Sequence, residues 1–254
     1  MTPAYDTAAA SPSPHPAANG LPAAAWTAFR VLAVIAGLSA IMVVAGHFYG
    51  SRLLQSSMST SPEPIQLVIG NDVLDVPENM IRHEAQRVPG VTGRVDLRLY
   101  WPERAGYRLS HADAFSDTDP ETTQTVLISV AKRQWLLDMA GRLELVYGKA
   151  ADASAAPRPL HGLTALRLDP AHGYVDETLY FAPSANGGAL PAFIARCNEP
   201  AAGATPLLLA CETDLFFGET LEARIRFPAH FLADWARFRS ELDAFLHGLQ
   251  VRAE

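Results

Sequence analysis

Residues 31–51 read VLAVIAGLSAIMVVAGHFYGS and lie between Arg30 and Arg52, with no charged side chain among them. A helix of these 21 residues rises about 30 Å, which is the thickness of the hydrocarbon core of a bilayer. The run therefore predicts a transmembrane helix over residues 30–52 that contacts lipid through residues 31–51. Everything that follows in the chain is attached to whatever membrane holds this helix.

A cleaved signal peptide is the main alternative for such a run. Signal peptides carry a shorter apolar region, of about 7 to 15 residues, that ends in a small-x-small cleavage site. This run is longer, and no good A-x-A motif follows it. A buried core helix fits poorly, because apolar residues occupy every face of the run. We therefore expect a retained membrane anchor.

Composition indicates one folded domain after the anchor. The chain has 254 residues, 49% of them hydrophobic, and a formal net charge of −7. After Arg52 there are 26 acidic and 18 basic residues, which gives this part a formal charge of −8. An acidic domain without a basic stripe argues against a nucleic acid partner and against a polybasic attachment to anionic lipid.

Three further segments accompany the anchor. Residues 1–29 begin with a long stretch of Ala, Pro and Ser that cannot bury enough apolar surface to fold, so we expect a disordered cytoplasmic tail. Residues 53–64 read as a short polar linker, and residues 65–254 as the folded domain, which we place in the periplasm. Arg30 and Arg52 leave the positive-inside count tied, so the orientation depends on the cysteines considered below.

Alternating side chains predict the strands of the first half of the domain. Residues 65–69 and 73–76 alternate on either side of Gly70-Asn71, the pattern of a hairpin with a two-residue turn that begins with glycine. Residues 94–100 (RVDLRLY) alternate cleanly between charged and apolar side chains, and residues 125–132 form a further strand. The polar connection between these two strands is long enough to be functional.

The sequence of the second half of the domain predicts more strands and one long helix. Five apolar segments are separated by Pro, Gly and Asn clusters: TALRLD (164–169), ETLYFA (177–182), AFIARC (192–197), LLLACETDLFF (207–217) and LEARIRFP (221–228). Pro228 then opens an amphipathic helix that reaches Leu249. Residues 133–147 fit a helix or a strand, and a short helix ending near Gly141 is favoured. The expected fold class is α+β, a mainly antiparallel sheet over a long C-terminal helix.

The two cysteines of the chain, Cys197 and Cys211, predict a disulfide bond. They lie in two apolar strand candidates joined by a Pro- and Gly-rich turn region, so antiparallel pairing would bring them together. Such a bond persists in an oxidising compartment, which would place the domain in the periplasm and the N-terminus in the cytoplasm. The alternative is two buried, reduced thiols.

Two stretches resemble metal sites, and both are incomplete. His83 and Glu84 begin like the zinc-protease motif H-E-x-x-H, but Arg87 stands where the second histidine is needed. Asp117, Asp119 and Glu121 alternate like the start of a calcium loop. That loop would require glycine and an acid where Thr122 and Ile128 stand. No metal or cofactor is expected.

The remaining chemical candidates are weaker. No serine elbow, C-x-x-C motif or phosphate-binding glycine loop occurs, and Gly187-Gly188 reads as a turn. Paired carboxylates could support a hydrolase, either in the 111–121 loop or at Asp176 and Glu177. An exposed position at a strand start is the simpler interpretation of the latter pair.

Three segments resemble a group of alphaproteobacterial membrane-anchored proteins with no known activity: VPENMIRHEAQR (76–87), LRLYWPERAGY (97–107) and GYVDETLYF (173–181). The resemblance extends from Ile65 to the end of the sequence. It implies an inner-membrane anchor with a periplasmic domain, and it implies no substrate and no catalytic residue.

These observations favour a non-enzymatic envelope protein. Its domain would contact a protein in or near the same membrane, as a subunit of an envelope assembly. Aromatic residues near loops, namely Tyr100, Trp101 and Tyr107, are the candidate contacts. The alternatives are the carboxylate-dependent hydrolase, an immunity factor against a periplasmic toxin, and a ligand-binding module with a cavity between the sheet and the C-terminal helix.

Overall fold

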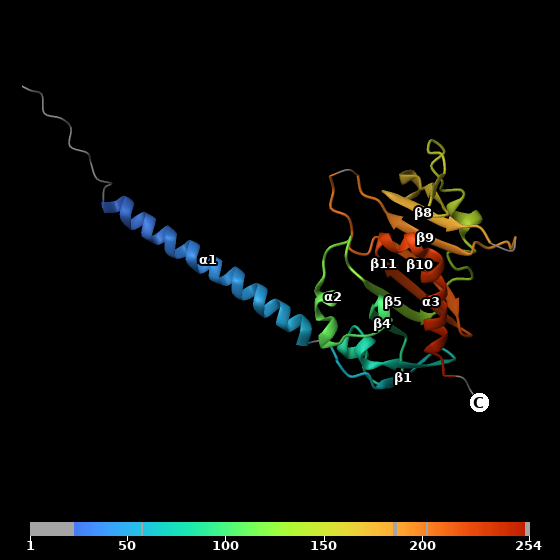
Figure 1. Ribbon diagram of the computed structural model, residues 1–254, viewed down its shortest axis with the longest axis horizontal. Coiled ribbons are helices and arrows are strands. Elements are labelled where there is room, and N and C mark those ends of the chain that lie inside the picture. Colours follow the sequence, from blue (N-terminus) through green and yellow to red (C-terminus); the bar gives the residue numbers. More distant parts are fainter. Residues whose placement is uncertain (1–22, 57, 185–186, 202, 252–254) are drawn as a thin grey trace, which may run out of the picture. The chain divides into compact units, whose positions relative to one another are not determined.

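The computed structural model describes residues 23–56, 58–184, 187–201 and 203–251. The chain divides between Leu54 and Gln55 into two units, which we describe separately. Figure 1 shows the helix of the first unit and the strands of the second. The expected tail up to residue 22 lies outside the described residues.

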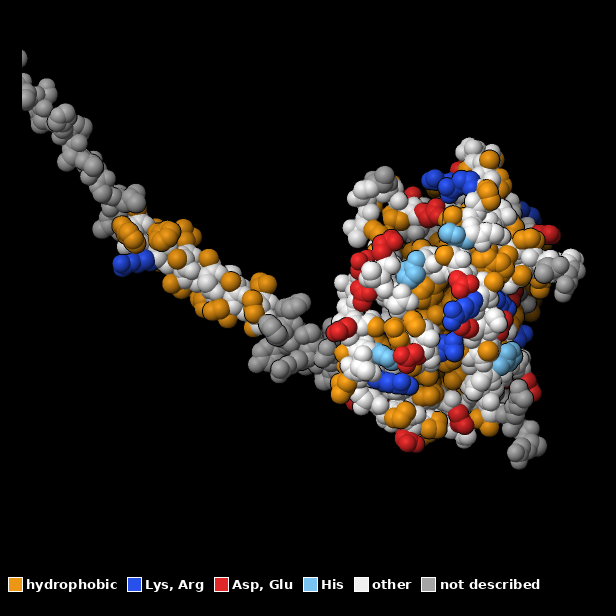
Figure 2. Space-filling model, viewed as in Figure 1, with side chains coloured by type: hydrophobic (Ala, Val, Ile, Leu, Met, Phe, Trp, Pro, Cys, Tyr) orange, Lys and Arg blue, Asp and Glu red, His pale blue; other side chains and the backbone are white. Residues whose placement is uncertain are grey.

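The first unit contains helix α1 (Ala23–Ser56), which extends beyond both ends of the predicted 30–52 helix. Within it, Ala25–Gly46 forms a 22-residue stretch that is long and apolar enough to cross a membrane. Its large apolar side chains from Trp26 to Val44 are 53–75% exposed, and Figure 2 shows hydrophobic side chains along the visible face of the helix. The first four residues of the expected 53–64 linker belong to this helix.

The second unit is built on an eight-stranded antiparallel sheet with the order β4-β5-β11-β10-β9-β8-β7-β6. Its strands are β4 (Arg94–Tyr100), β5 (Thr125–Lys132), β6 (Arg158–Leu160), β7 (Leu163–Arg167), β8 (Glu177–Ala182), β9 (Phe193–Asn198), β10 (Cys211–Phe217) and β11 (Leu221–Phe227). The α+β prediction is confirmed. The short edge strand β6 is the one strand of this sheet that sequence alternation did not indicate.

A second, three-stranded sheet has the order β2-β1-β3. Strands β1 (Pro64–Ile69) and β2 (Asp72–Pro77) form the predicted hairpin, in which Gly70 takes a φ of 64° that favours glycine. Strand β3 (Gly90–Val91) adds two residues parallel to β1. Short helical turns complete the unit: η1 (Glu78–Met80), η2 (Glu84–Gln86), η3 (Trp101–Glu103), η4 (Leu109–His111), α2 (Ala112–Ser116), η5 (Leu143–Tyr147), η6 (Pro170–His172) and η7 (Ala229–Asp234).

The main core lies between one face of the large sheet, the small sheet and helix α3 (Trp235–Gly248). Pro228 caps η7, which leads into α3. The ring of Phe238 lies 4.8 Å from the rings of both Trp101 and Phe227, so the helix is fixed by aromatic packing. The predicted C-terminal amphipathic helix is thus present, with its first turns tightened into η7.

A smaller core lies on the outer face of the large sheet, away from α3. The chain between β5 and β6 contributes Met139 and Tyr147 to it, over Leu168, Leu179 and Ile194. The prediction of a short helix ending near Gly141 is wrong: residues 139–142 form turns, and the helical turn η5 follows Gly141. The apolar residues of this segment pack on a neighbouring face of the sheet. Their spacing therefore follows neither the period of a helix nor that of a strand.

Candidate functional site

Part of the outer face of the large sheet is hollowed into a groove. The smaller core covers β7 to β9, whereas β4, β5 and β11 carry a groove of about 440 Å³. The groove is lined by Arg82, Arg94, Asp96, Leu97, Leu127, Ser129, Ala131, Lys132, Gln134, Trp135, Glu222, Arg224 and Arg226. Most of these residues alternate along their strands with core residues, so they point away from α3.

The hollow shape follows from side-chain length. Strand β5 runs between β4 and β11 and presents the short side chains of Ser129 and Ala131. Ser129 is paired with Asp96 on one side and with Arg224 on the other. Long side chains on the two outer strands therefore form the walls of a trough whose floor is the middle strand.

The acidic side chains lie at the bottom of the groove. The carboxylate of Asp96 accepts hydrogen bonds from Ser129, from the guanidinium of Arg94 at 2.8 Å and from Gln86 at 3.1 Å. Burial raises the pKa of Asp96, but these bonds outweigh it and hold the pKa below its ordinary value. Asp96 and Glu222 are only 8% exposed, so both are covered.

The basic side chains form the accessible surface of the groove. The side chains of Arg94 and Arg226 are 60% exposed and that of Arg224 is 49% exposed. Five cationic and two acidic residues line the groove, an excess of three positive charges in a chain whose formal charge is −7. The groove is therefore a local positive region on an acidic domain.

Arg98 extends the positive charge beyond the groove along β4. Its guanidinium donates to the carbonyl oxygen of Phe115 at 2.6 Å and lies 5.1 Å from the centre of the Phe115 ring. Burial lowers the pKa of Arg98, and the nearby positive charge of Arg82 lowers it further. Among the described residues, neither arginine forms an ion pair with a carboxylate.

An exposed apolar bend borders the groove. Trp135, Leu136 and Leu137 are consecutive and are 62%, 96% and 41% exposed. They follow Lys132 at the end of β5, on the way to the smaller core. Three large apolar side chains exposed together are costly in water, and a contiguous patch of this kind marks an interaction site.

The chain is fastened on both sides of this bend. Before it, the guanidinium of Arg133 lies 4.2 Å from the centre of the Phe216 ring, and its backbone N–H donates to Thr220 at 2.7 Å. After it, the buried carboxylate of Asp214 accepts from the backbone N–H of Met139 and from the guanidinium of Arg142. The bend is thus held in place by β10 and by the turn between β10 and β11.

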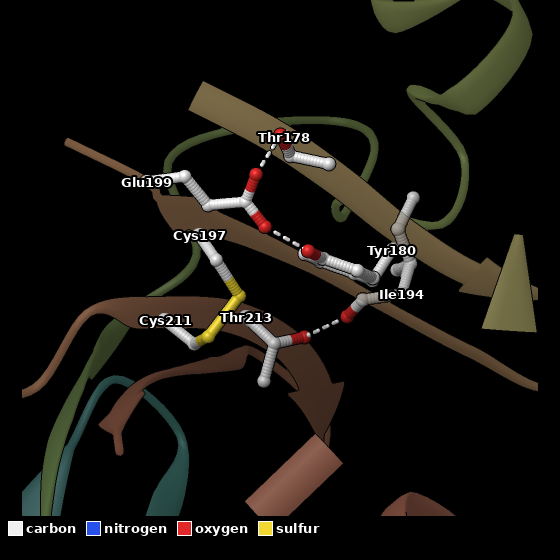
Figure 3. The surroundings of a disulfide bond; sticks show 7 residues. All are labelled: Thr178, Tyr180, Ile194, Cys197, Glu199, Cys211 and Thr213. Carbon is white, nitrogen blue, oxygen red and sulfur yellow. Dashed lines mark hydrogen bonds between the residues drawn. A yellow bond between two sulfur atoms is a disulfide. The ribbon is translucent and has the colours of Figure 1, made fainter. Parts of the chain in front are cut away.

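The predicted disulfide is present. Cys197 and Cys211 are paired in the β9–β10 register, are bonded to each other and are buried at 2% and 0% exposure. Figure 3 shows the Glu199 carboxylate beside this bond, between the hydroxyl groups of Thr178 and Tyr180, which both donate to it. Burial and the bond to Glu199 raise the pKa of Tyr180. This cluster is part of the structural framework of the sheet.

Two of the three aromatic contact candidates are buried, and the third is half-buried. Trp101 and Tyr107 are 6% and 4% exposed, so the premise that they are exposed is wrong. Trp101 packs on Phe238 and Tyr107 on Phe115, because the connection after β4 folds back over the core. Tyr100 is half-buried against His111, and its role as a partner contact stays a prediction.

The two metal-like stretches serve structural roles. The guanidinium of Arg87 donates to the carbonyl oxygen of Ile81 at 3.0 and 3.2 Å, which closes the turn around His83 and Glu84. Asp117 accepts from the Asp119 N–H and the Thr122 hydroxyl, each at 2.9 Å. Asp119 accepts from the Glu121 N–H. No cluster of metal ligands occurs among the described residues.

The hydrolase candidates lie outside the groove. Arg196 lies between Glu177 and Glu212, at 3.3 and 3.6 Å from their carboxylates, and the three side chains form an ion cluster across β8, β9 and β10. Burial raises the pKa of Glu177, and Arg196 offsets part of this. Neither Asp176 and Glu177 nor the carboxylates of the 111–121 loop line the groove.

The interface between the large sheet and α3, the expected place for a ligand cavity, is filled. The inward side chains of α3 are Phe238, Leu242 and Leu246, and all are at most 4% exposed within the main core. Sequence reasoning missed the groove instead. LEARIRFP was predicted only as a strand, and nothing local shows that β11 lies beside β5.

No family model matches the sequence, and no curated protein is similar to it. Two solved structures show weak similarity. The immunity protein Smlt3025 of the Stenotrophomonas maltophilia type IV secretion system has a TM-score of 0.47 and 15% identity, covering 76% of this chain and 95% of that chain. The Neisseria meningitidis iron-regulated outer membrane lipoprotein FrpD has a TM-score of 0.44 and 9% identity, covering 76% and 94%. At these scores neither indicates a function here.

Proposed function

We propose that this protein is a non-enzymatic binding protein of the bacterial envelope that offers the groove on β4, β5 and β11 to a protein partner. The observation that carries the proposal is the open face itself. Helix α3 and the smaller core cover other parts of the sheet, whereas here a positive groove is lined by the exposed Trp135, which the exposed Leu136 and Leu137 follow in sequence. Arginine and tryptophan are the side chains that contribute most often to binding energy at protein interfaces.

The proposed location combines the anchor with the disulfide. Helix α1 supports a single-pass inner-membrane protein, as the resemblance to alphaproteobacterial anchored proteins also implies. The bond between Cys197 and Cys211 supports an oxidising compartment for the domain, hence a periplasmic domain and a cytoplasmic N-terminus. An assembly subunit and an immunity factor that blocks a periplasmic toxin are both forms of this function.

A short tether supports a partner in or near the same membrane. The carbonyl oxygens of Ser61 and Glu63 accept hydrogen bonds from the backbone N–H groups of Asn79 and Glu78, each at 2.9 Å, so the linker is already part of the domain there. Four residues, 57–60, remain between Ser56 and Ser61. Together with the ten helical residues 47–56, this linker spans at most about 30 Å beyond the apolar stretch, so the proposed tether keeps the domain near the membrane.

Photo-crosslinking in intact cells tests this function. A photoreactive amino acid at Trp135 probes the rim of the groove, and the same group at Arg237, on α3, is the control. We expect ultraviolet light to produce a discrete protein adduct from position 135 and none from position 237. Absence of an adduct at position 135, or equal adducts at both, would contradict the proposal. Mass spectrometry of the adduct identifies the partner.

A further inference from the structure

We infer that the partner enters the groove with an acidic, extended segment that also carries a large apolar side chain. This inference rests on the proposed function and specifies the chemistry of the partner. Three features of the groove support it: the shape of the trough, the uneven distribution of its charges and the apolar bend at its rim.

The trough has the dimensions of an extended peptide. Its floor follows β5 from Leu127 to Ala131, which at about 3.4 Å per residue is a length of roughly 14 Å, or about four residues of extended chain. The side chains of β5 that face the trough recur at every second residue, as do those of an extended ligand. The walls on β4 and β11 carry charged residues at the same spacing.

The charges favour an acidic ligand. Asp96 and Glu222 compensate part of the positive charge from below, where a partner does not reach them. The guanidinium of Arg226 uses its Nε to bond Glu212 at 2.9 Å, and Arg224 contacts Glu222 at 3.6 Å. A guanidinium has five N–H donors, so these arginines retain donors for carboxylates of a ligand.

The bend supplies the apolar half of the contact. Trp135 is 62% exposed and lines the groove, and Leu136, the next residue, is 96% exposed. An acidic segment alone would leave this apolar surface in water. A segment with a Leu or an aromatic residue next to its carboxylates would cover both surfaces at once.

An anionic lipid surface fits the groove less well than a polypeptide does. The residues after Arg52 carry a formal charge of −8, which opposes attraction to an anionic bilayer. The floor of the trough is recessed between the arginine walls, and a planar headgroup layer meets the walls without filling it. The test below therefore includes anionic phospholipid as a competing ligand.

Peptide binding to the full-length protein in phosphatidylcholine nanodiscs tests the inference. Three fluorescent peptides share one leucine and differ at four positions, which are all Glu, all Gln or all Lys. We expect the Glu peptide to bind at least about tenfold more tightly than the Gln peptide, with an affinity that falls as salt rises, and the Lys peptide not to bind. Equal binding of the Glu and Gln peptides would overturn the inference.

Variants locate the binding site. Arg224→Gln combined with Arg226→Gln should remove most of the preference for Glu, and Trp135→Ala should weaken the Glu and Gln peptides alike. Arg237→Gln combined with Arg239→Gln removes two cations from α3 and should change nothing. An intact Cys197–Cys211 bond and an unchanged unfolding midpoint show that each variant is folded. Loss of binding in the α3 control would also overturn the inference.

A further experiment with anionic lipid distinguishes an acidic polypeptide from lipid headgroups as the ligand of the groove. Nanodiscs containing phosphatidylglycerol should leave peptide affinity unchanged, whereas displacement of the Glu peptide by this lipid would assign the groove to headgroups and contradict the inference. If position 135 crosslinks to a protein while no peptide prefers Glu, the proposed function stands and the acidic partner does not.

Discussion

Asp72, the first residue of β2, joins the small sheet to the large one. Its carboxylate accepts hydrogen bonds from the backbone N–H groups of Glu219 and Thr220 and from the Thr220 hydroxyl, each at 2.9 Å. These donors lie in the turn between β10 and β11, where Gly218 has a φ of 59° and an added Cβ would collide with Asp72. One side chain therefore fixes the position of a hairpin that is remote in sequence.

We expect Asp72→Asn to lower the free energy of unfolding by about 1–3 kcal/mol, because the amide presents N–H groups to donors that need an acceptor. Urea unfolding followed by tryptophan fluorescence measures this change. Asp75→Asn is the matched control, since Asp75 is exposed on the same strand, and it should change stability by less than about 0.5 kcal/mol. Equal effects of the two substitutions would show that the bonds at Asp72 do not stabilise the fold.

The stability contributed by Asp72 depends on pH, and the direction of its pKa shift fixes the sign of that dependence. Partial burial raises the pKa of Asp72, but the hydrogen bonds from Glu219 and Thr220 outweigh it, so its pKa in the folded protein lies below the ordinary value of 3.8. Its stabilisation is present above the unfolded-state pKa and is lost as pH falls through the folded-state pKa. The stability difference between wild type and Asp72→Asn should be constant near neutral pH and shrink below about pH 4.

At the scale of elements, the disulfide closes the β9–β10 pair. Only two residue pairs, Cys211 with Cys197 and Glu212 with Arg196, are in register between these strands, so the covalent bond reinforces a short stretch of the described ladder. We expect replacement of both cysteines by alanine to lower the free energy of unfolding by about 3 kcal/mol, the loop-entropy value for a loop of about 15 residues.

Urea unfolding of the double variant and of reduced wild type should give matching midpoints. Alkylation without reductant of protein from freshly isolated membranes should label no cysteine. Two labelled cysteines in that material would contradict both the bond and the periplasmic orientation that depends on it.

Elements with a strict period of two were predictable from sequence. The β1–β2 hairpin, β4 and β5 appear where alternation and turn residues indicated them, because one face of each is buried and the other is not. The segment after β5 was not predictable in this way. Its apolar residues divide between an exposed bend at Trp135 and a cover over the smaller core at Met139, so no single period describes them.

The groove was beyond sequence reasoning for a different reason. Its walls come from β4 and β11, which lie on opposite sides of β5 and are far apart in the chain. Alternation shows that Arg224 and Arg226 share the outward face of β11, but strand order decides that Ser129, and beyond it Asp96, stand opposite Arg224. The disulfide was predictable because its two strands are consecutive.

The proposed attachment of the whole molecule to a membrane rests on α1. We expect the full-length protein to remain with membranes after washes with high salt and alkaline carbonate, because burial of apolar side chains is not screened by salt. Immunoblotting of pellet and supernatant measures this, and a version that begins at Ser59 should appear in the supernatant. Full-length protein in the wash supernatant would mean that α1 is not an anchor.

The pairing of residues 249–251 with β2 governs when the domain can fold. The backbone N–H of Val251 donates to Val73 at 3.0 Å, and that of Asp75 donates to Leu249 at 2.8 Å. Asp72 and Gln250, which also touch, are 178 residues apart. During synthesis Gln250 is made 178 residues after Asp72, so the native pairing of the hairpin with residues 249–251 must wait for the intervening chain. Contacts this distant in sequence make folding slow. Until residues 249–251 are made, β2 lacks this neighbour, and its unpaired backbone groups are open to proteases and chaperones.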